Sequence, residues 1–247
     1  MAVQGPSSPT TSGAMSVGIL DVRTVSGVGS VNRVRALPAR LAAPARSLRL
    51  PEESGRIRLH TLQHAAVLRD LETKGVHRPP RWPADHDFAE SYSWMHEQMA
   101  RRLPTTGEGI IWSWAQIRRR DLTPDCPEAR GEVLLSVDLP RDRVLLSHFG
   151  DWHCVLNRMI HVEGRPGEDD DAYDRRVDPI YDAFFDRREA AGLTHEPVKV
   201  WPDDLRQQAE SSWTAIFDQS SWPPRDAIQA TVHEIRAEDV VRAVRIC

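Results

Sequence analysis

The sequence predicts an α+β fold, with a mostly antiparallel sheet and helices around it, in a single domain over residues 55–247. Segments with the two-residue alternation of strands are scattered among segments with helical periodicity, an order typical of this class. With 40% hydrophobic and 28% charged residues, the composition is that of an ordinary globular protein. No internal repeat is visible, so a solenoid is not indicated.

Residues 1–54 are predicted to be a flexible leader rich in Arg, Ala and Pro. They hold too few large apolar side chains to offset the entropy lost on ordering. The first 50 residues carry six arginines and a single acid, Asp21. A basic arm for RNA or lipid is one interpretation. A solvated tail, or translation that starts at Met15, is the simpler one.

The charge of the predicted domain limits its partners. The chain as a whole carries −4, so the part after the basic leader is clearly acidic and a poor match for nucleic acid phosphates. Three cysteines without a C-x-x-C pair are typical of a reducing cytoplasm. The sequence has no apolar run of about 18 residues, so no membrane span is expected. The preference for arginine over lysine is associated with GC-rich bacteria.

Periodicity and turn residues predict the elements of the first half. "RIRLHTL" alternates as a half-buried strand, and Thr61 is expected to cap a helix that ends at Gly75. A second helix is expected in "FAESYSWMHEQMARRL". Further strands are expected in "GIIWSWAQI", "GEVLLSVDLP" and "RVLLS".

The second half is predicted to continue with helices and to close on a strand. Helices are expected in "YDAFFDRREAAGL" and "AESSWTAIFD", a strand in "AIQATVHEI", and a short helix or turn in "RAEDVVRAV". The acidic run 168–171 matches no calcium loop and is expected to be a solvated loop.

The stretch "SHFGDWHCVLN" at 147–157 is unusually rich in reactive residue types. Ser147 or Asp151 suits the N-cap of a helix whose apolar face includes Trp152. The His, Asp and Cys side chains are too close in sequence to converge on one ion, so no metal is expected. The interpretations that remain are packing with capping, or the wall of a binding site.

Tryptophan is the more informative residue, because the chain has eight of them. Alternation in "WSW" puts Trp112 and Trp114 on one side of their strand, with Ser113 opposite. Such a face is either core or a platform on which a flat ligand stacks. The sequence contains no G-x-G-x-x-G, phosphate-loop or G-x-S-x-G motif, so it gives no motif-based sign of a Rossmann dinucleotide site, a phosphate loop or a serine hydrolase.

Several segments together resemble a family of bacterial proteins listed as domain of unknown function 3841. They are "LHTLQ…VLRDLETKGV", "FAESYSWMHEQMARRLP", "IIWSWAQ", "VLLSHFGDWHCVLN", "SWTAIFD" and "IQATVHEIRAEDVV". The resemblance covers about residues 56–245 in order and spacing. It implies no activity, because the family has none assigned.

A second resemblance, to ADP-ribosyltransferase-type domains, lies in "LHT" followed by a helix and in "IQATVHEIRAEDVV". It implies NAD as cofactor, with His60 and Thr61 at the nicotinamide ribose and Trp112 or Trp114 stacked on nicotinamide. Glu234 or Gln229 would then act near the anomeric carbon. Where the family has an acid two residues after the Gln229 position, this chain has a threonine. Without that carboxylate, such a fold would bind a nucleotide without turning it over.

Three functional hypotheses follow from these patterns. The leading one is a transferase-like domain that binds NAD or a related nucleotide in a cleft between the first strand and the "IIWSW" strand, with His60 and Glu234 facing it. The rival is a non-catalytic module whose tryptophan-lined groove binds a protein or small ligand. The third is an RNA-associated factor that acts through the leader. Purely structural roles for His60 and Glu234 remain open alternatives.

Overall fold

The protein is described by a computed structural model that covers residues 35–37, 42–43, 55–122 and 131–247. Most of the predicted leader therefore lies outside the described residues. Its residues 35–37 are described, and they form a short strand at one edge of the main sheet.

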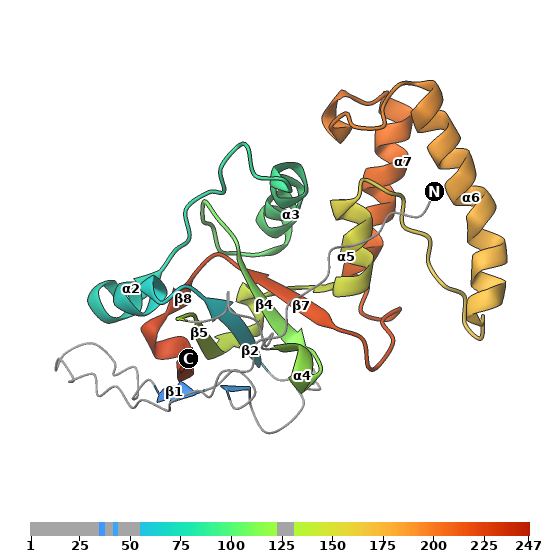
Figure 1. The fold of residues 1–247 in the computed structure, drawn as a ribbon. Coiled ribbons are helices and arrows are strands. Elements are labelled where there is room, and N and C mark those ends of the chain that lie inside the picture. The colour runs from blue at the N-terminus through green and yellow to red at the C-terminus, as the bar shows by residue number, and fades with distance from the viewer. Residues whose placement is uncertain (1–34, 38–41, 44–54, 123–130) are drawn as a thin grey trace, which may run out of the picture.

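A seven-stranded sheet dominates the fold (Figure 1), in the order β1-β9-β5-β2-β4-β7-β6. Its strands are β1 (Arg35–Leu37), β2 (Arg56–Gln63), β4 (Ile111–Gln116), β5 (Val133–Pro140), β6 (Leu145–His148), β7 (Ile228–Val232) and β9 (Val240–Ile246). Neighbouring strands are antiparallel except for the parallel pair β1 and β9. The predicted α+β fold with a mostly antiparallel sheet is confirmed.

The end of the chain departs from the prediction. Strand β7 stops at Val232, and Ile235–Arg236 form β8, which pairs with β3 (Val76–His77) in a separate two-stranded sheet. The short helix or turn expected in "RAEDVVRAV" is confirmed only for Ala237–Asp239, which form a 3-10 turn, because Val240–Ile246 form β9 alongside β5. The β-branched residues of this segment favour a strand, and pairing with β5 outweighs its weak helical pattern.

The helices lie around the sheet. They are α2 (Ala66–Lys74), α3 (Ala89–Arg102), α4 (Arg119–Leu122), α5 (Phe149–Leu156), α6 (Asp170–Ala190) and α7 (Asp203–Trp213). Short 3-10 turns lie at Arg141–Arg143, Val198–Val200, Thr214–Phe217 and Ala237–Asp239. Gly75 ends α2 with φ of 73°, as predicted. Thr61 does not cap this helix, because β2 continues through it to Gln63.

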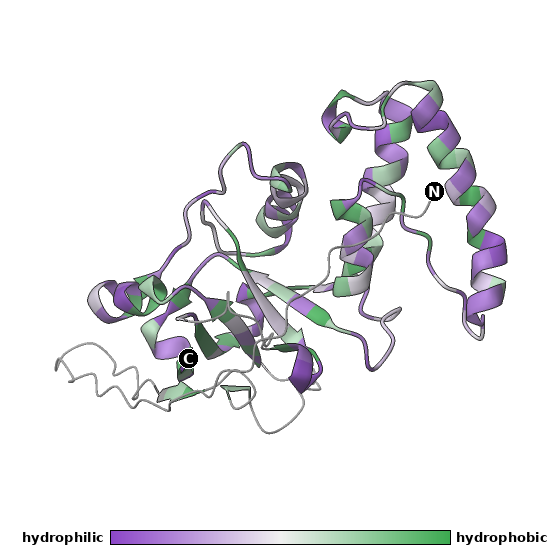
Figure 2. Cartoon of the chain, viewed as in Figure 1, coloured by the Kyte–Doolittle hydropathy of each residue, from purple (hydrophilic) through white to green (hydrophobic). Residues whose placement is uncertain are grey.

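Helix α6 begins well before the segment predicted for it. The side chain of Asp169 accepts a hydrogen bond from the backbone N–H of Ala172, and Asp170 and Asp171 lie in the first turn, where acids favour the helix dipole. The run predicted as a solvated loop therefore starts the helix, which continues past Pro179. Figure 2 shows α6 as largely hydrophilic. Within the described ranges, no helix is both long and apolar enough to cross a membrane.

Two clusters of buried side chains position the functional region. In one, Val67, Leu68 and Leu71 of α2 pack against the sheet with Ile57 and Leu59 of β2. The other joins α3, α5, α6 and α7, which Figure 1 shows on one side of the sheet, with Leu145 of β6. Trp112 of β4 packs against this helical cluster, whereas Trp114 packs against a third cluster that includes Leu122 and Leu134.

Candidate functional site

A hollow of about 380 Å³ lies where strands β2, β4 and β7 meet helices α3 and α5. Its lining residues are Thr61, Leu62, Phe88, Tyr92, Trp112, Ser113, Trp114, Phe149, Trp152, His153, Leu156 and Gln229. Four of the six residues that the sequence nominates thus line one hollow, and both β2 and the "IIWSW" strand contribute to it.

The hollow is placed at an irregular junction in the sheet. Strands β2 and β4 pair in register at His60 opposite Trp114. One residue further along β2, the hydroxyl of Thr61 donates a 2.7 Å hydrogen bond to the carbonyl of Trp112. Gln63 Nε2 donates to the same hydroxyl at 2.7 Å. Side chains thus supply hydrogen bonds at the junction where the two strands diverge from regular pairing.

Aromatic rings form most of the wall. The ring centroids of Trp112 and Trp152 are 5.1 Å apart, and those of Trp112 and Tyr92 are 5.2 Å apart. Trp114 meets Phe149 edge to face at 4.8 Å. Trp112 and Trp114 lie on one face of β4, as their spacing predicts, and Ser113 is buried on the opposite face. The indoles therefore present faces to a cavity as well as to the core.

Polar atoms without partners accompany these rings. Trp112 Nε1 and Ser113 Oγ are buried and have no hydrogen-bond partner in the described part of the chain. Gln229 is 4% exposed, and its Nε2 donates to Ser147 Oγ at 3.0 Å. Buried polar groups are nearly always satisfied in folded proteins. The unpartnered N–H of Trp112 is consistent with a ligand that supplies an acceptor, whereas Ser113 lies on the opposite face of β4 and pairs in register with Ala230.

His60 lies beside the hollow but does not line it. Its side chain is 3% exposed, Nδ1 is 2.9 Å from Ser136 Oγ, and Nε2 is buried without a partner among the described residues. Burial, followed by the charges of Arg58 and Arg242, lowers the pKa of His60 to about 4. The imidazole is therefore neutral at physiological pH.

Glu234 is placed elsewhere. It follows the end of β7, five residues after Gln229, a span of roughly 16 Å along an extended chain. Its carboxylate contacts three guanidinium groups, at 2.5 Å from Arg78, 2.8 Å from Arg236 and 3.5 Å from Arg143. Burial acts to raise the pKa of Glu234, but Arg236 and Arg78 outweigh it and hold the pKa below its ordinary value. The residue does not line the hollow.

One family model matches the part of the chain that contains the hollow, His60 and Glu234. The model of a family described as domain of unknown function (DUF3841) matches residues 58–241, which include all six nominated residues. The chain belongs to the DUF3841 family. No curated protein and no solved structure gives a significant match.

The stretch "SHFGDWHCVLN" forms a wall of the hollow in this DUF3841 domain. Phe149, Trp152 and His153 of α5 all line it. The N-cap of α5 is His148 rather than Ser147 or Asp151, because His148 Nδ1 accepts from the backbone N–H of Asp151. Burial raises the pKa of the Cys154 thiol to about 11, which makes it a poor nucleophile.

The sequence offered the wall of a binding site as one interpretation of residues 147–157, and Phe149, Trp152, His153 and Leu156 of α5 do line the hollow. It did not nominate Tyr92 of α3. The apolar face of each helix was visible in the sequence, but not which strand it would cover. Within the described ranges, no group of three or more His, Cys, Asp and Glu side chains is arranged to hold a metal ion.

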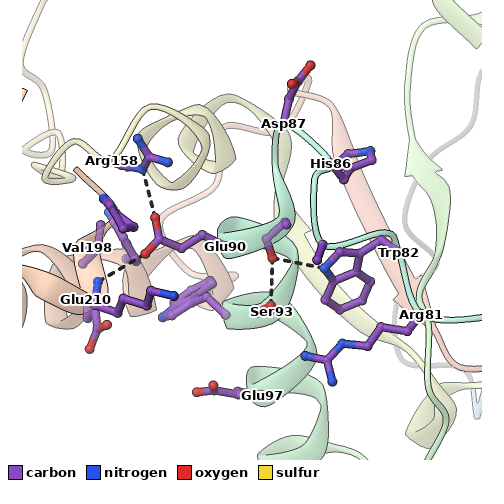
Figure 3. A pocket seen from close by; sticks show the side chains of 16 residues that line it. Arg81, Trp82, His86, Asp87, Glu90, Ser93, Glu97, Arg158, Val198 and Glu210 are labelled. Carbon is purple, nitrogen blue, oxygen red and sulfur yellow. Dashed lines mark hydrogen bonds and ion pairs between the residues drawn. The ribbon is translucent and has the colours of Figure 1, made fainter. Parts of the chain in front are cut away.

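A second and larger cavity, of about 650 Å³, lies on the other side of α3 (Figure 3). It contains none of the nominated residues. Its walls come from the loop before α3, from α3 itself, from the turn at Val198–Val200 and from α7.

Proposed function

We propose that the DUF3841 domain binds the planar heterocycle of a small ligand, with NAD or a related nucleotide as the ligand class, in the hollow between β2 and β4. One observation carries the proposal. The indoles of Trp112 and Trp114 border one hollow, and the buried N–H of Trp112 has no partner among the described residues. Base–aromatic stacking contributes about 1–3 kcal/mol per base and tolerates different heterocycles.

The size of the hollow fits a ring rather than a whole dinucleotide. Small-molecule sites commonly measure about 300–1,000 Å³, and this one, at about 380 Å³, is near the lower end. A heterocycle and part of its sugar fill it, and the phosphates of a nucleotide then extend outside. The side-chain amide of Gln229 and the N–H of Trp112 are the groups available for the polar edge of the ring.

The lining of the hollow supports binding and offers no carboxylate for transfer chemistry. ADP-ribosyl transfer needs an acid to oppose the positive charge that develops on the sugar. Glu234, the nominated acid, is held by three arginines beyond the end of β7. We therefore assign no catalytic step to the hollow. An assay of NAD cleavage by the wild-type chain tests this assignment, and it is expected to give no turnover.

Thermal shift and calorimetry with NAD, nicotinamide mononucleotide and AMP test the binding. A ligand present at 100 times its dissociation constant should stabilise the protein by about 2.7 kcal/mol. Substitution of Trp112→Ala together with Trp114→Ala should abolish that gain. Trp201→Phe, in the helical cluster away from the hollow, is the matched control and should retain it. A gain that persists in the double variant, or no gain with any nucleotide, would contradict the proposal.

The alternative function is a non-catalytic module that captures a protein segment. Phe88 favours it, because this aromatic residue lines the hollow and is nevertheless 42% exposed. On this alternative, Phe88→Ser weakens partner capture, and the nucleotide panel produces no stabilisation. Binding of a nucleotide that is unaffected by Phe88→Ser would instead favour the small ligand.

A further inference from the structure

The larger cavity on the other side of α3 combines charged and aromatic walls (Figure 3). Its charged lining side chains are Arg81, Asp87, Glu90, Glu97, Arg158, Lys199 and Glu210. Trp82, Trp94 and Trp213 supply the indoles. The ligand class depends on which of these groups already have partners within the protein.

Glu90 and Arg158 satisfy each other. Glu90 Oε2 accepts from Arg158 Nε at 2.9 Å, and Oε1 accepts from the backbone N–H of Lys199 at 3.2 Å. Figure 3 shows both contacts. This carboxylate is fixed in place, and the positive charge of Arg158 is neutralised.

The other two glutamates have no such partner. Glu210 makes no hydrogen bond or ion pair within the described part of the chain, and Glu97 only reaches Arg101, at 3.7 Å between exposed side chains. Burial raises the pKa of Glu210; Arg206 and Arg101 act against this shift, while the like charges of Glu97 and Glu90 add to it. Glu210 therefore has no direct ion-pair partner, although Arg206 and Arg101 lie close enough to act on its charge.

The aromatic wall offers one free hydrogen-bond donor. Trp213 Nε1 donates to the carbonyl of Met159 and is satisfied. Trp94 is 8% exposed as a whole residue, and its indole N–H, which makes no hydrogen bond in the described ranges, is not enclosed by protein atoms. Such an N–H on the wall of a cavity can donate to an acceptor on a molecule that binds there.

The other two cations that line the cavity, Arg81 and Lys199, make no ion pair with Glu97 or Glu210 in the described part of the chain. The guanidinium of Arg81 lies over the ring of Trp82, 5.6 Å from its centroid. The side chain of Lys199 is exposed at the margin and makes no ion pair within the described residues. The indole of Trp82 thus already holds one guanidinium in the geometry of a cation–π contact.

We propose that this cavity binds a guanidinium or alkylammonium group, with the charge between Glu97 and Glu210 and the stem against the indoles. Carboxylates pair with these cations, and indole faces attract them. An acceptor near the charged group, such as a peptide carbonyl, would satisfy Trp94. The proposal does not depend on the hollow, although Trp94 and Trp152, one from each lining, have ring centroids only 6.5 Å apart.

Calorimetry on the full chain tests the proposal with the peptide Gly-Arg-Gly and with agmatine, a free guanidinium compound. The matched control is Gly-citrulline-Gly, which has nearly the shape of the arginine peptide without the charge. We expect the citrulline peptide to bind at least tenfold more weakly than the arginine peptide. If the arginine peptide binds more tightly than agmatine, the ligand is an arginine side chain of a protein. If agmatine binds more tightly, the ligand is a free small molecule.

Variants locate the site. Glu210→Gln keeps the shape of the side chain and should weaken the arginine peptide at least tenfold, with an unchanged melting temperature. Glu72→Gln, an exposed acid on α2, should leave affinity unchanged. Lys199→Met should strengthen binding by removal of a like charge. Equal affinity for the citrulline peptide, undiminished affinity in Glu210→Gln, or no binding of either guanidinium probe would overturn the proposal.

Discussion

The two ends of strand β7 carry polar residues in opposite situations. At one end, Gln229 lines an aromatic hollow, where its Nε2 donates to Ser147 Oγ and where the N–H of Trp112 has no partner among the described residues. At the other end, Glu234 is surrounded by guanidinium groups. The sequence treats both residues as candidates for the same role.

Whether a polar group already has partners within the protein decides whether it is available to a ligand. A carboxylate whose oxygens are occupied by arginines stabilises the fold, and its removal exposes the remaining charges to an unfavourable environment. An amide or indole N–H that lacks a partner beside a cavity costs stability unless something binds there. The hollow end of β7 is therefore the functional candidate, and the arginine end is structural.

The largest expected effect is at the structural end. Glu234→Ala should lower the free energy of unfolding by about 3–5 kcal/mol, because it leaves the nearly buried Arg143 with Asp239 as its one remaining carboxylate partner among the described residues, beside the backbone carbonyl of residue 234. Urea denaturation measures this loss. The control Glu238→Ala removes an exposed acid that contacts the same Arg236 at 3.8 Å, and it should cost less than about 1 kcal/mol. Equal stability of Glu234→Ala and wild type would mean that the arginines do not need this carboxylate.

The next effect is the dependence of stability on pH at His60. Its pKa is about 4 in the folded chain and about 6.5 when unfolded, so the unfolded state binds the proton first as the pH falls. The contribution of the neutral imidazole is complete above pH 6.5 and is lost between pH 6.5 and about 4, to a total of about 3 kcal/mol. Urea midpoints of wild type and His60→Gln should therefore converge on acidification. Parallel pH profiles would contradict the buried neutral state.

A smaller effect is expected from a single atom in the hollow. Trp112→Phe keeps an aromatic face and removes the unpartnered N–H, which should weaken a nucleotide ligand by about 0.5–1.5 kcal/mol, or roughly threefold to tenfold. The matched control is Trp222→Phe. It removes another buried N–H without a described partner, outside the hollow, and should leave affinity unchanged. An equal loss in both variants would indicate a general effect of destabilisation.

The smallest effect concerns how Gln229 is held. Ser147→Ala removes the acceptor for Gln229 Nε2, so the amide is no longer oriented, and ligand affinity should fall by about 0.5–1 kcal/mol. Calorimetry with the nucleotide that binds most tightly to the wild-type chain measures this loss of affinity. Ser136→Ala, which removes the partner of His60 on the same sheet, is the comparison and should change stability more than affinity. A larger loss of affinity in Ser136→Ala would place the ligand closer to His60.

Local patterns predicted much of the candidate site. Alternation in "WSW" put two indoles on one face of β4, and the apolar face of α5 was readable from its spacing. These predictions succeed because side-chain direction within one element follows from backbone geometry alone. The start of α6 was missed because the acidic run 168–171 suggested a solvated loop, whereas Asp169 caps the helix and Asp170 and Asp171 form its first turn.

By itself, the sequence determined the fold class, most of the elements, and the face on which the tryptophans of β4 lie. Only the tertiary structure decided that α3 and α5 close over that face, and that Glu234 is bound by arginines as distant in the chain as Arg78 and Arg143. The reason is that periodicity is a property of a few consecutive residues. Strand order and ion pairing depend instead on how all the apolar faces and charges of the chain are buried together.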